Sequence, residues 1–138
     1  MMRALGVDPG KKRLGLAVSD PTGILARPLG VIKHTSRPID AATIAQIAAD
    51  EDVGIIVLGQ ALDIEGKPTV EGRSAARLAA AIRTQTSIPV ILWDETGSTQ
   101  AARQTQIEMG VSRAKRRGHL DEIAAAIILQ SYLDAHSP

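Results

Sequence analysis

The stretch GVDPGKKRLGLAVSDP, residues 6–21, sets two apolar segments on either side of a short basic turn. Residues 3–8 and 13–19 predict strands, since the second alternates large and small apolar residues with the period of a half-buried strand. The connection, residues 9–12, has hairpin length, so the two strands are expected to be antiparallel neighbours. Asp8 ends the first strand, either as an ordinary turn residue or as an acid held in place to bind a metal ion.

The segments that follow predict an edge strand, a helix and a buried strand. Residues 24–33 indicate a third strand, and Pro28 within it favours a position at the edge of a sheet. A helix is expected from Ser36, with Gly54 as its end. The β-branched run at residues 55–59 is typical of a buried parallel strand.

The second half of the chain predicts further units of the same kind. Apolar residues at helical spacing over 75–82 predict a helix, and residues 88–93 predict a buried strand. Two more helices are expected, over 99–108 and through 120–133. We therefore expect one α/β domain spanning residues 1–138. A three-stranded antiparallel meander and two parallel βα units would form a mixed five-stranded sheet flanked by helices.

Composition restricts the chemistry that is open to this chain. Only 1% of its 138 residues are aromatic although 44% are apolar, which argues against a base-stacking platform. There is no cysteine, and the three histidines show no metal-ligand spacing, so any metal would be a hard cation held by carboxylates. The sequence shows no secretory signal and no apolar run of spanning length, so we expect a cytoplasmic protein with no membrane partner.

Five acidic residues are candidates for one site. Asp8 follows the first strand, Asp94 and Glu95 follow the strand at 88–93, and Asp121 and Glu122 are expected to open the last helix. Singly, each is explained by turn formation, helix capping or the helix dipole. Together they would meet at the carboxyl edge of the sheet, where carboxylates repel one another unless Mg²⁺ or Mn²⁺ neutralises them. Two such ions can clamp the attacking water and the leaving oxygen of a phosphodiester.

Basic residues accompany these acids, although the net charge of the whole chain is only +1. An acidic pocket on a basic body suits a polyanion such as nucleic acid. The candidate phosphate contacts are Lys11, Lys12, Arg13, Arg73, Arg77, Arg113, Lys115, Arg116 and Arg117. For Arg73 and Arg77, a solvated helix face is nearly as good an interpretation.

Four stretches of the chain resemble the YqgF/RuvX family of bacterial RNase H-like proteins, which are described as pre-16S rRNA nucleases or Holliday junction resolvase homologues. They are GVDPGKKRLGLAVSDPTG (6–23), IIVLGQALDIEGKPTVEGRSAAR (55–77), VILWDETGSTQAAR (90–103) and GHLDEIAAAIILQSYL (118–133). The resemblance implies a ribonuclease H-like fold and divalent-metal nuclease activity on structured nucleic acid.

By position, the resemblance assigns Asp8, Glu95 and Asp121 as metal-binding catalytic acids. Two stretches depart from the family pattern. Thr96-Gly97 stands where the family usually has arginine and a hydrophobic residue, so a phosphate-facing arginine is missing. Residues 59–63 read Gly-Gln-Ala-Leu-Asp in place of the usual Gly-Leu-Pro-Leu-Asn.

Several functions stay open at this point. Processing of the 5′ end of precursor 16S rRNA is favoured, because the resemblance is to a group usually linked to it. Holliday junction resolution is the alternative, and symmetric cutting of a junction would require a homodimer. Two less favoured interpretations are an actin-like nucleotide phosphotransferase, which also opens with an Asp-x-Gly hairpin, and a noncatalytic nucleic-acid-binding module.

Overall fold

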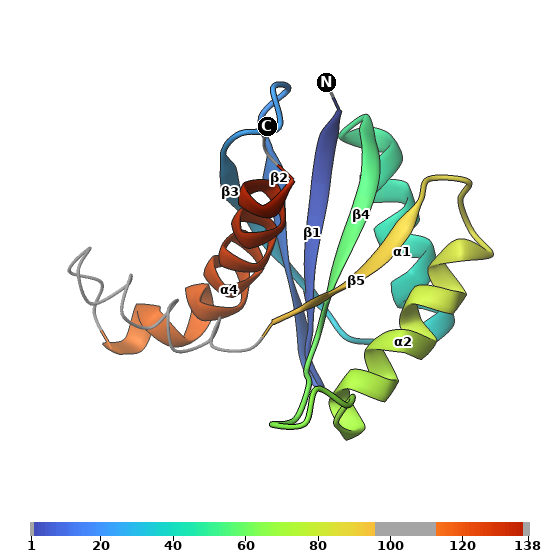
Figure 1. The fold of residues 1–138 in the computed structure, drawn as a ribbon, viewed down its shortest axis with the longest axis vertical. Helices are drawn as coiled ribbons and strands as arrows, with labels where there is room; N and C mark the ends of the chain where they lie inside the picture. Colours follow the sequence, from blue (N-terminus) through green and yellow to red (C-terminus); the bar gives the residue numbers. More distant parts are fainter. Residues whose placement is uncertain (1, 96–112, 137–138) are drawn as a thin grey trace.

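A computed structural model describes residues 2–95 and 113–136, with side chains for 2–95 and 121–136. Three helices flank one sheet: α1 and α2 lie on one face and α4 lies on the other (Figure 1). The elements in chain order are β1 (Arg3–Pro9), β2 (Arg13–Ser19), β3 (Ala26–Lys33), α1 (Arg37–Asp50), β4 (Val53–Gln60), α2 (Val70–Arg83), β5 (Val90–Asp94) and α4 (Arg113–Ala135).

The sheet has five strands in the order β3-β2-β1-β4-β5. The pairs β1–β2 and β2–β3 are antiparallel, whereas β1–β4 and β4–β5 are parallel. This confirms the predicted meander followed by two parallel units, and Pro28 does lie in an edge strand. Because β1, β4 and β5 run in the same direction, their carboxyl ends share one edge of the sheet.

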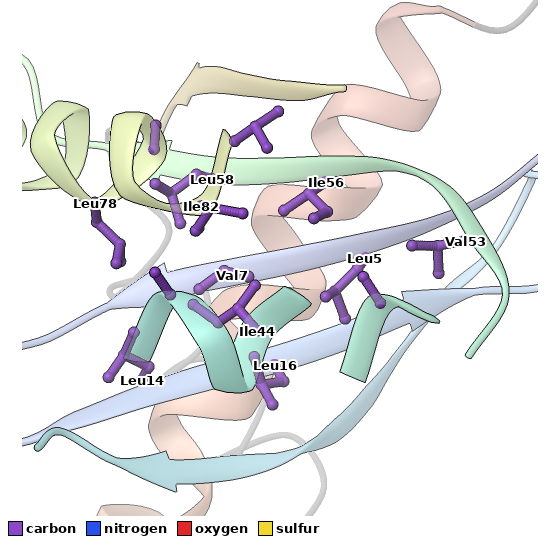
Figure 2. Packing of buried hydrophobic residues seen from close by; sticks show 14 of the residues in the cluster. Leu5, Val7, Leu14, Leu16, Ile44, Val53, Ile56, Leu58, Leu78 and Ile82 are labelled. Carbon is purple, nitrogen blue, oxygen red and sulfur yellow. The ribbon is translucent and has the colours of Figure 1, made fainter. Parts of the chain in front are cut away.

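Large aliphatic side chains fill the space between the sheet and the pair α1 and α2 (Figure 2). Alternate residues of β1, β2 and β4 point to this face, as the period of a strand requires. Those labelled in the figure are Leu5, Val7, Leu14, Leu16, Ile44, Val53, Ile56, Leu58, Leu78 and Ile82. All ten are buried, so this face contains most of the large side chains of the core.

The opposite face, under α4, has small residues beside larger apolar ones such as Val57 and Trp93. Ala4 and Ala17 from the strands pack with Ala125 and Leu129 of the helix. A Cβ atom added at Gly6 would come within 2.8 Å of the Leu129 Cβ, so α4 could not keep its present distance from the sheet. The small side chains therefore allow a close helix-to-sheet approach on this face.

Two helix boundaries differ from the prediction. Helix α1 begins as expected, with Ser36 as its N-cap, but it ends at Asp50 rather than at Gly54. Asp52 has a φ of 54° and ends the helix in the left-handed conformation, while Gly54 belongs to β4.

The predicted start of the last helix is also wrong. Helix α4 begins at Arg113, so Asp121 and Glu122 lie well inside it instead of opening it. The basic run at 113–117 continues the helix because arginine, lysine and alanine are good helix formers. The dipole at a helix start therefore does not explain the two acids.

Two strands start later than predicted. Strand β3 starts at Ala26, because the backbone N–H groups of Ile24 and Leu25 donate to the Asp20 side chain in the preceding turn. Strand β5 covers Val90–Asp94. The helix predicted over 99–108 lies outside the described residues. Within the part of the chain that the structure describes, no helix has the length and apolar character needed to span a membrane.

Candidate active site

Two acids reach the α4 face from the carboxyl ends of β1 and β5. Asp8 follows Val7, which points to the opposite core, so the Asp8 side chain lies on the α4 side of the sheet. Glu95 directly follows β5, and its backbone N–H donates to the Gln60 carbonyl at 3.1 Å. This bond extends the pairing of β5 with β4 by one residue. Because alternate residues of a strand point to the same face, the Glu95 side chain lies on the α4 side together with Trp93.

Gly59 lies between these two acids, because β4 separates β1 from β5. A Cβ atom at Gly59 would lie 2.7 Å from the Glu95 Oε2 and 2.8 Å from the Ile128 Cδ1. The Glu95 side chain therefore passes over the position where a side chain of residue 59 would stand. Sequence analysis includes Gly59 in a motif but does not predict its role in the site. Its place at the end of a buried strand, beside the expected acids, is the signal that could have indicated that role.

A second glycine brings the third acid to the site. Gly15 pairs with Asp8 across β1 and β2. A Cβ atom at Gly15 would overlap the backbone oxygen of Asp121, so α4 crosses the sheet directly above this residue. Asp121 comes close enough to Asp8 for its charge to act on the Asp8 carboxyl group.

The three carboxyl groups form one electrostatic unit. Burial raises the pKa of Asp8 to about 8, and the charge and hydrogen-bonding contact of Glu95 and the charge of Asp121 add to the increase. Burial also raises the pKa of Glu95, and the charge of Asp94 adds to it, whereas the contact with Asp8 opposes the rise. The Asp8 carboxyl group therefore binds a proton more readily than an ordinary aspartate.

One oxygen of this unit has no partner. Glu95 Oε2 is buried and accepts no hydrogen bond. An unpaired buried carboxylate oxygen is costly, and hard carboxylate oxygens are the donors that Mg²⁺ and Mn²⁺ prefer. Residues 2–95 and 121–136 contain no three acidic or histidine side chains already arranged around one ion. Asp8 and Glu95 thus fit as ligands for a cation, whereas Asp121 is engaged elsewhere.

Arg13 is the partner that engages Asp121. Its Nε donates to the Asp121 Oδ2 at 2.7 Å, and the two side chains are 50% and 26% exposed. Arg13 was predicted to contact phosphate, yet the structure also makes it the counterion of a candidate metal ligand. The two residues are far apart in the sequence, so only the fold reveals the pair.

The other two acids lie at the border of the site. Asp94 is exposed at the end of β5, and its charge acts on Glu95. Glu122 follows Asp121 in α4 and is half-buried. The structure thus brings together Asp8, Glu95 and Asp121, with Asp94 as a nearby charge.

The predicted phosphate contacts fall into three groups. Lys11, Lys12 and Arg13 are exposed on the turn between β1 and β2, where Lys11 pairs with Glu71 at 3.7 Å. Arg73 and Arg77 are exposed on α2, one helical turn apart. The third group opens α4, and its side chains lie outside the described residues: Arg113, Lys115, Arg116 and Arg117.

Solved structures of nucleases share this fold. RuvC of T. thermophilus, in complex with a Holliday junction substrate, matches 98% of this chain and 95% of its own with a TM-score of 0.60 at 19% identity. The fowlpox virus Holliday junction resolvase matches 97% of this chain and 99% of its own, also with a TM-score of 0.60, at 14% identity. These likenesses establish the RNase H-like fold that was predicted.

Sequence comparison identifies the family. The family model RuvX, described as Holliday junction resolvase, matches residues 2–135. A Myxococcus xanthus protein described as "Putative pre-16S rRNA nuclease" is 39% identical over 137 residues, which cover 99% of this chain and 91% of the relative. A Geobacillus kaustophilus protein with the same description is 42% identical over 136 residues, covering 97% of this chain and 99% of the relative. The chain therefore belongs to the RuvX family and is a nuclease of RNase H-like fold.

Proposed function

We propose that this nuclease depends on a divalent cation held by Asp8, Glu95 and Asp121, and that it processes the 5′ end of precursor 16S rRNA. The observation that carries the proposal is the buried Glu95 Oε2 atom, which has no hydrogen-bond partner and lies near a second, half-buried acid, Asp8. A cluster of this kind is unfavourable for folding alone, so a ligand that compensates its charge is expected.

Mg²⁺ or Mn²⁺ is the cation that suits this donor set. When bound there, it would polarise the phosphodiester and help to activate the attacking water. Asp8 and Glu95, both half-buried, would supply two of the ligands. Asp121 would become available when Arg13 exchanges its carboxylate for a phosphate oxygen, which a guanidinium group binds equally well.

The turn between β1 and β2 would hold the substrate against this centre. Lys12 and Arg13 are exposed there, next to the strand end that carries Asp8. Their charges can orient a phosphodiester by its non-bridging oxygens without reading the bases. The turn would therefore bind the backbone of the nucleic acid, and selection of the substrate would rest on its shape.

Precursor rRNA is our first candidate because relatives of nearly the same length carry that description. Holliday junction DNA is the second, because it is the substrate named in the description of the family model. Resolution of a junction would further require a twofold homodimer that presents two sites. Light scattering of the purified protein, alone and with a junction, would measure this.

The test compares cleavage of a precursor 16S rRNA fragment with cleavage of a four-way DNA junction, each with Mg²⁺ or Mn²⁺. We expect Asp8→Asn, Glu95→Gln and Asp121→Asn to lower the cleavage rate by roughly 10²-fold or more while the variants stay folded. Glu65→Gln is the matched control, because Glu65 is an exposed acid in a loop, paired with Lys67.

Trp93 offers a direct signal of cation binding. It is half-buried, lies two residues before Glu95, and has its ring edge-on to Tyr132 at 5.4 Å. Mn²⁺ should perturb its fluorescence in the wild type and less so in Asp8→Asn. Binding of Mn²⁺ without cleavage of either nucleic acid would contradict the proposal and favour a noncatalytic binding module.

A further inference from the structure

A groove lies on the face of the sheet opposite the acidic centre. Two cavities of about 440 and 330 Å³ share the residues Pro9, Gly10, His34 and Ser74, so they form one continuous depression. It runs from the turn after β1 toward α2. Because Pro9 and Gly10 directly follow Asp8, the groove begins where the candidate active site ends.

Three permanently charged basic side chains and two acids, Asp40 and Glu71, line this groove among neutral residues. Lys11, His34, Arg37 and Arg77 contribute to it, together with the hydroxyl groups of two serines. Lys11 is paired with Glu71, which also lines the groove. Within residues 2–95 and 121–136, neither Arg37 nor Arg77 forms an ion pair, so both guanidinium groups are available to an anion.

His34 lines both cavities, and two contacts fix its position. Its Nδ1 contacts the Asp40 Oδ2 at 2.5 Å, and its backbone N–H donates to the Lys12 carbonyl at 2.9 Å. The other oxygen of Asp40 accepts from the Thr35 backbone N–H at 3.0 Å. Asp40 is 3% exposed and has both oxygens occupied, so it holds the imidazole of His34 in place.

The position of Arg37 has no structural benefit for its own helix. It is the first residue of α1, where the helix dipole favours negative charge and disfavours a cation. Its side chain lines the groove instead of pairing with a nearby acid. An anion bound in the groove would compensate both the guanidinium group and the positive end of the helix.

We propose that this groove binds a phosphodiester of the nucleic-acid substrate at a distance from the one that is cut. The proposal rests on the proposed nuclease function and extends it. A strand that passes the β1–β2 turn would have one phosphate at the acidic centre and another between His34, Arg37 and Arg77. Such contacts read no bases, so RNA and DNA backbones are both suitable.

The test measures binding without cleavage, in metal-free buffer, for a labelled precursor 16S rRNA fragment and a labelled four-way DNA junction. Fluorescence anisotropy is recorded over a range of salt concentrations for the wild type, Arg37→Gln/Arg77→Gln and Arg27→Gln. Arg27 is the matched control, because it is an exposed arginine on β3. It lies opposite Val18 in the β2–β3 register, at the end of β2 that is far from the β1–β2 turn.

For the double variant we expect the slope of log K against log salt to fall by about 0.7–0.9 for each phosphate that the groove no longer binds. Arg27→Gln should keep the wild-type slope. A reduced slope on RNA alone or on DNA alone would support the groove and identify which backbone occupies it.

Equal slopes in the double variant and the control, on both nucleic acids, would overturn the proposal. That result can occur while the wild type still cuts its substrate, in which case the nuclease function stands. Conversely, a lower slope in a protein that cuts neither nucleic acid would support the groove and contradict the nuclease.

Discussion

The two faces of the sheet use opposite kinds of residue. Under α1 and α2 the strands present leucine, isoleucine and valine, which are buried in a continuous core. Under α4 they present Gly6, Gly15 and Gly59 at the positions of closest approach. Large side chains stabilise the first face, whereas the glycines of the second face let α4 and the Glu95 side chain approach the strands closely. The larger aliphatic core and the candidate active site thus lie on opposite faces of one sheet.

The largest effect on stability should come from the aliphatic face. Ile82 of α2 is fully buried, so Ile82→Ala should lower the free energy of unfolding by about 2–5 kcal/mol. Urea denaturation would measure it. Ile39→Ala is the matched control, because Ile39 is 52% exposed and its truncation should have little effect. Equal losses in the two variants would contradict the division between the faces.

Gly59→Ala should have a smaller effect on stability and a large effect on the site. The new methyl group would meet Glu95 and Ile128 at the ends of their side chains, so both can shift at a cost of about 1–3 kcal/mol. We expect Mn²⁺ binding, followed by Trp93 fluorescence, to weaken because Glu95 is displaced from Asp8.

A second substitution separates packing from chemistry at this glycine. Ile128→Val in the Gly59→Ala background should relieve the aliphatic contact and recover stability, yet leave Mn²⁺ binding weak. If it restores both, then Gly59 acts through packing alone.

Asp8→Asn should remove a pH dependence that belongs to the acidic face. The pKa of Asp8 is about 8 in the folded protein and has its ordinary value of 3.8 when the chain is unfolded. Between these values the folded state holds a proton that the unfolded state releases, so the stability of the metal-free wild type falls as pH rises. The amide introduced by Asp8→Asn does not ionise, so the variant lacks this loss of stability.

From pH 4 to pH 8, we expect the free energy of unfolding of Asp8→Asn to rise by about 1–3 kcal/mol in total relative to that of the wild type. An isolated group would contribute ~1.4 kcal/mol for each pH unit, so the expected slope is shallower than that. Urea denaturation with EDTA at several pH values would measure it. Parallel pH profiles for the two proteins would show that the carboxyl group of Asp8 is not destabilised by its surroundings.

Arg13→Gln should give the smallest change in stability. Its bond to Asp121 is half-exposed, and such pairs contribute less than about 1 kcal/mol. Mn²⁺ should nevertheless bind more tightly, since a competing cation is removed from Asp121. Lys67→Gln removes a comparable exposed pair in a loop and serves as the control. Weaker Mn²⁺ binding in Arg13→Gln would show that Arg13 positions Asp121 for the ion.

Elements with a clear period were predictable from the sequence. The alternation in β2 and the helical spacing in α2 led to correct elements, because residues adjacent in the chain decide them. Boundaries set by special conformations were not. Asp52 ends α1 in a left-handed conformation that is usual for glycine, so the prediction chose Gly54 instead.

The sequence identified candidate acids for the site but not their contacts. Asp8 and Glu95 follow strand ends that the sequence pattern indicates, whereas Asp121 lies inside α4 and not at its start as predicted. In the structure the charges of Glu95 and Asp121 both act on Asp8. The pairing of Arg13 with Asp121 and the role of Gly59 depend on crossings between distant segments. Neither propensity nor periodicity contains that information, because it arises from the packing of α4 on the sheet.

The most direct test compares the free energy of unfolding at pH 8 with and without Mn²⁺, in the wild type and in Asp8→Asn. If carboxylates of the α4 face share a cation, saturating Mn²⁺ should stabilise the wild type by about 2–3 kcal/mol at a hundredfold excess over Kd, and Asp8→Asn by much less. An equal response in both proteins, or none in the wild type, would contradict the shared centre.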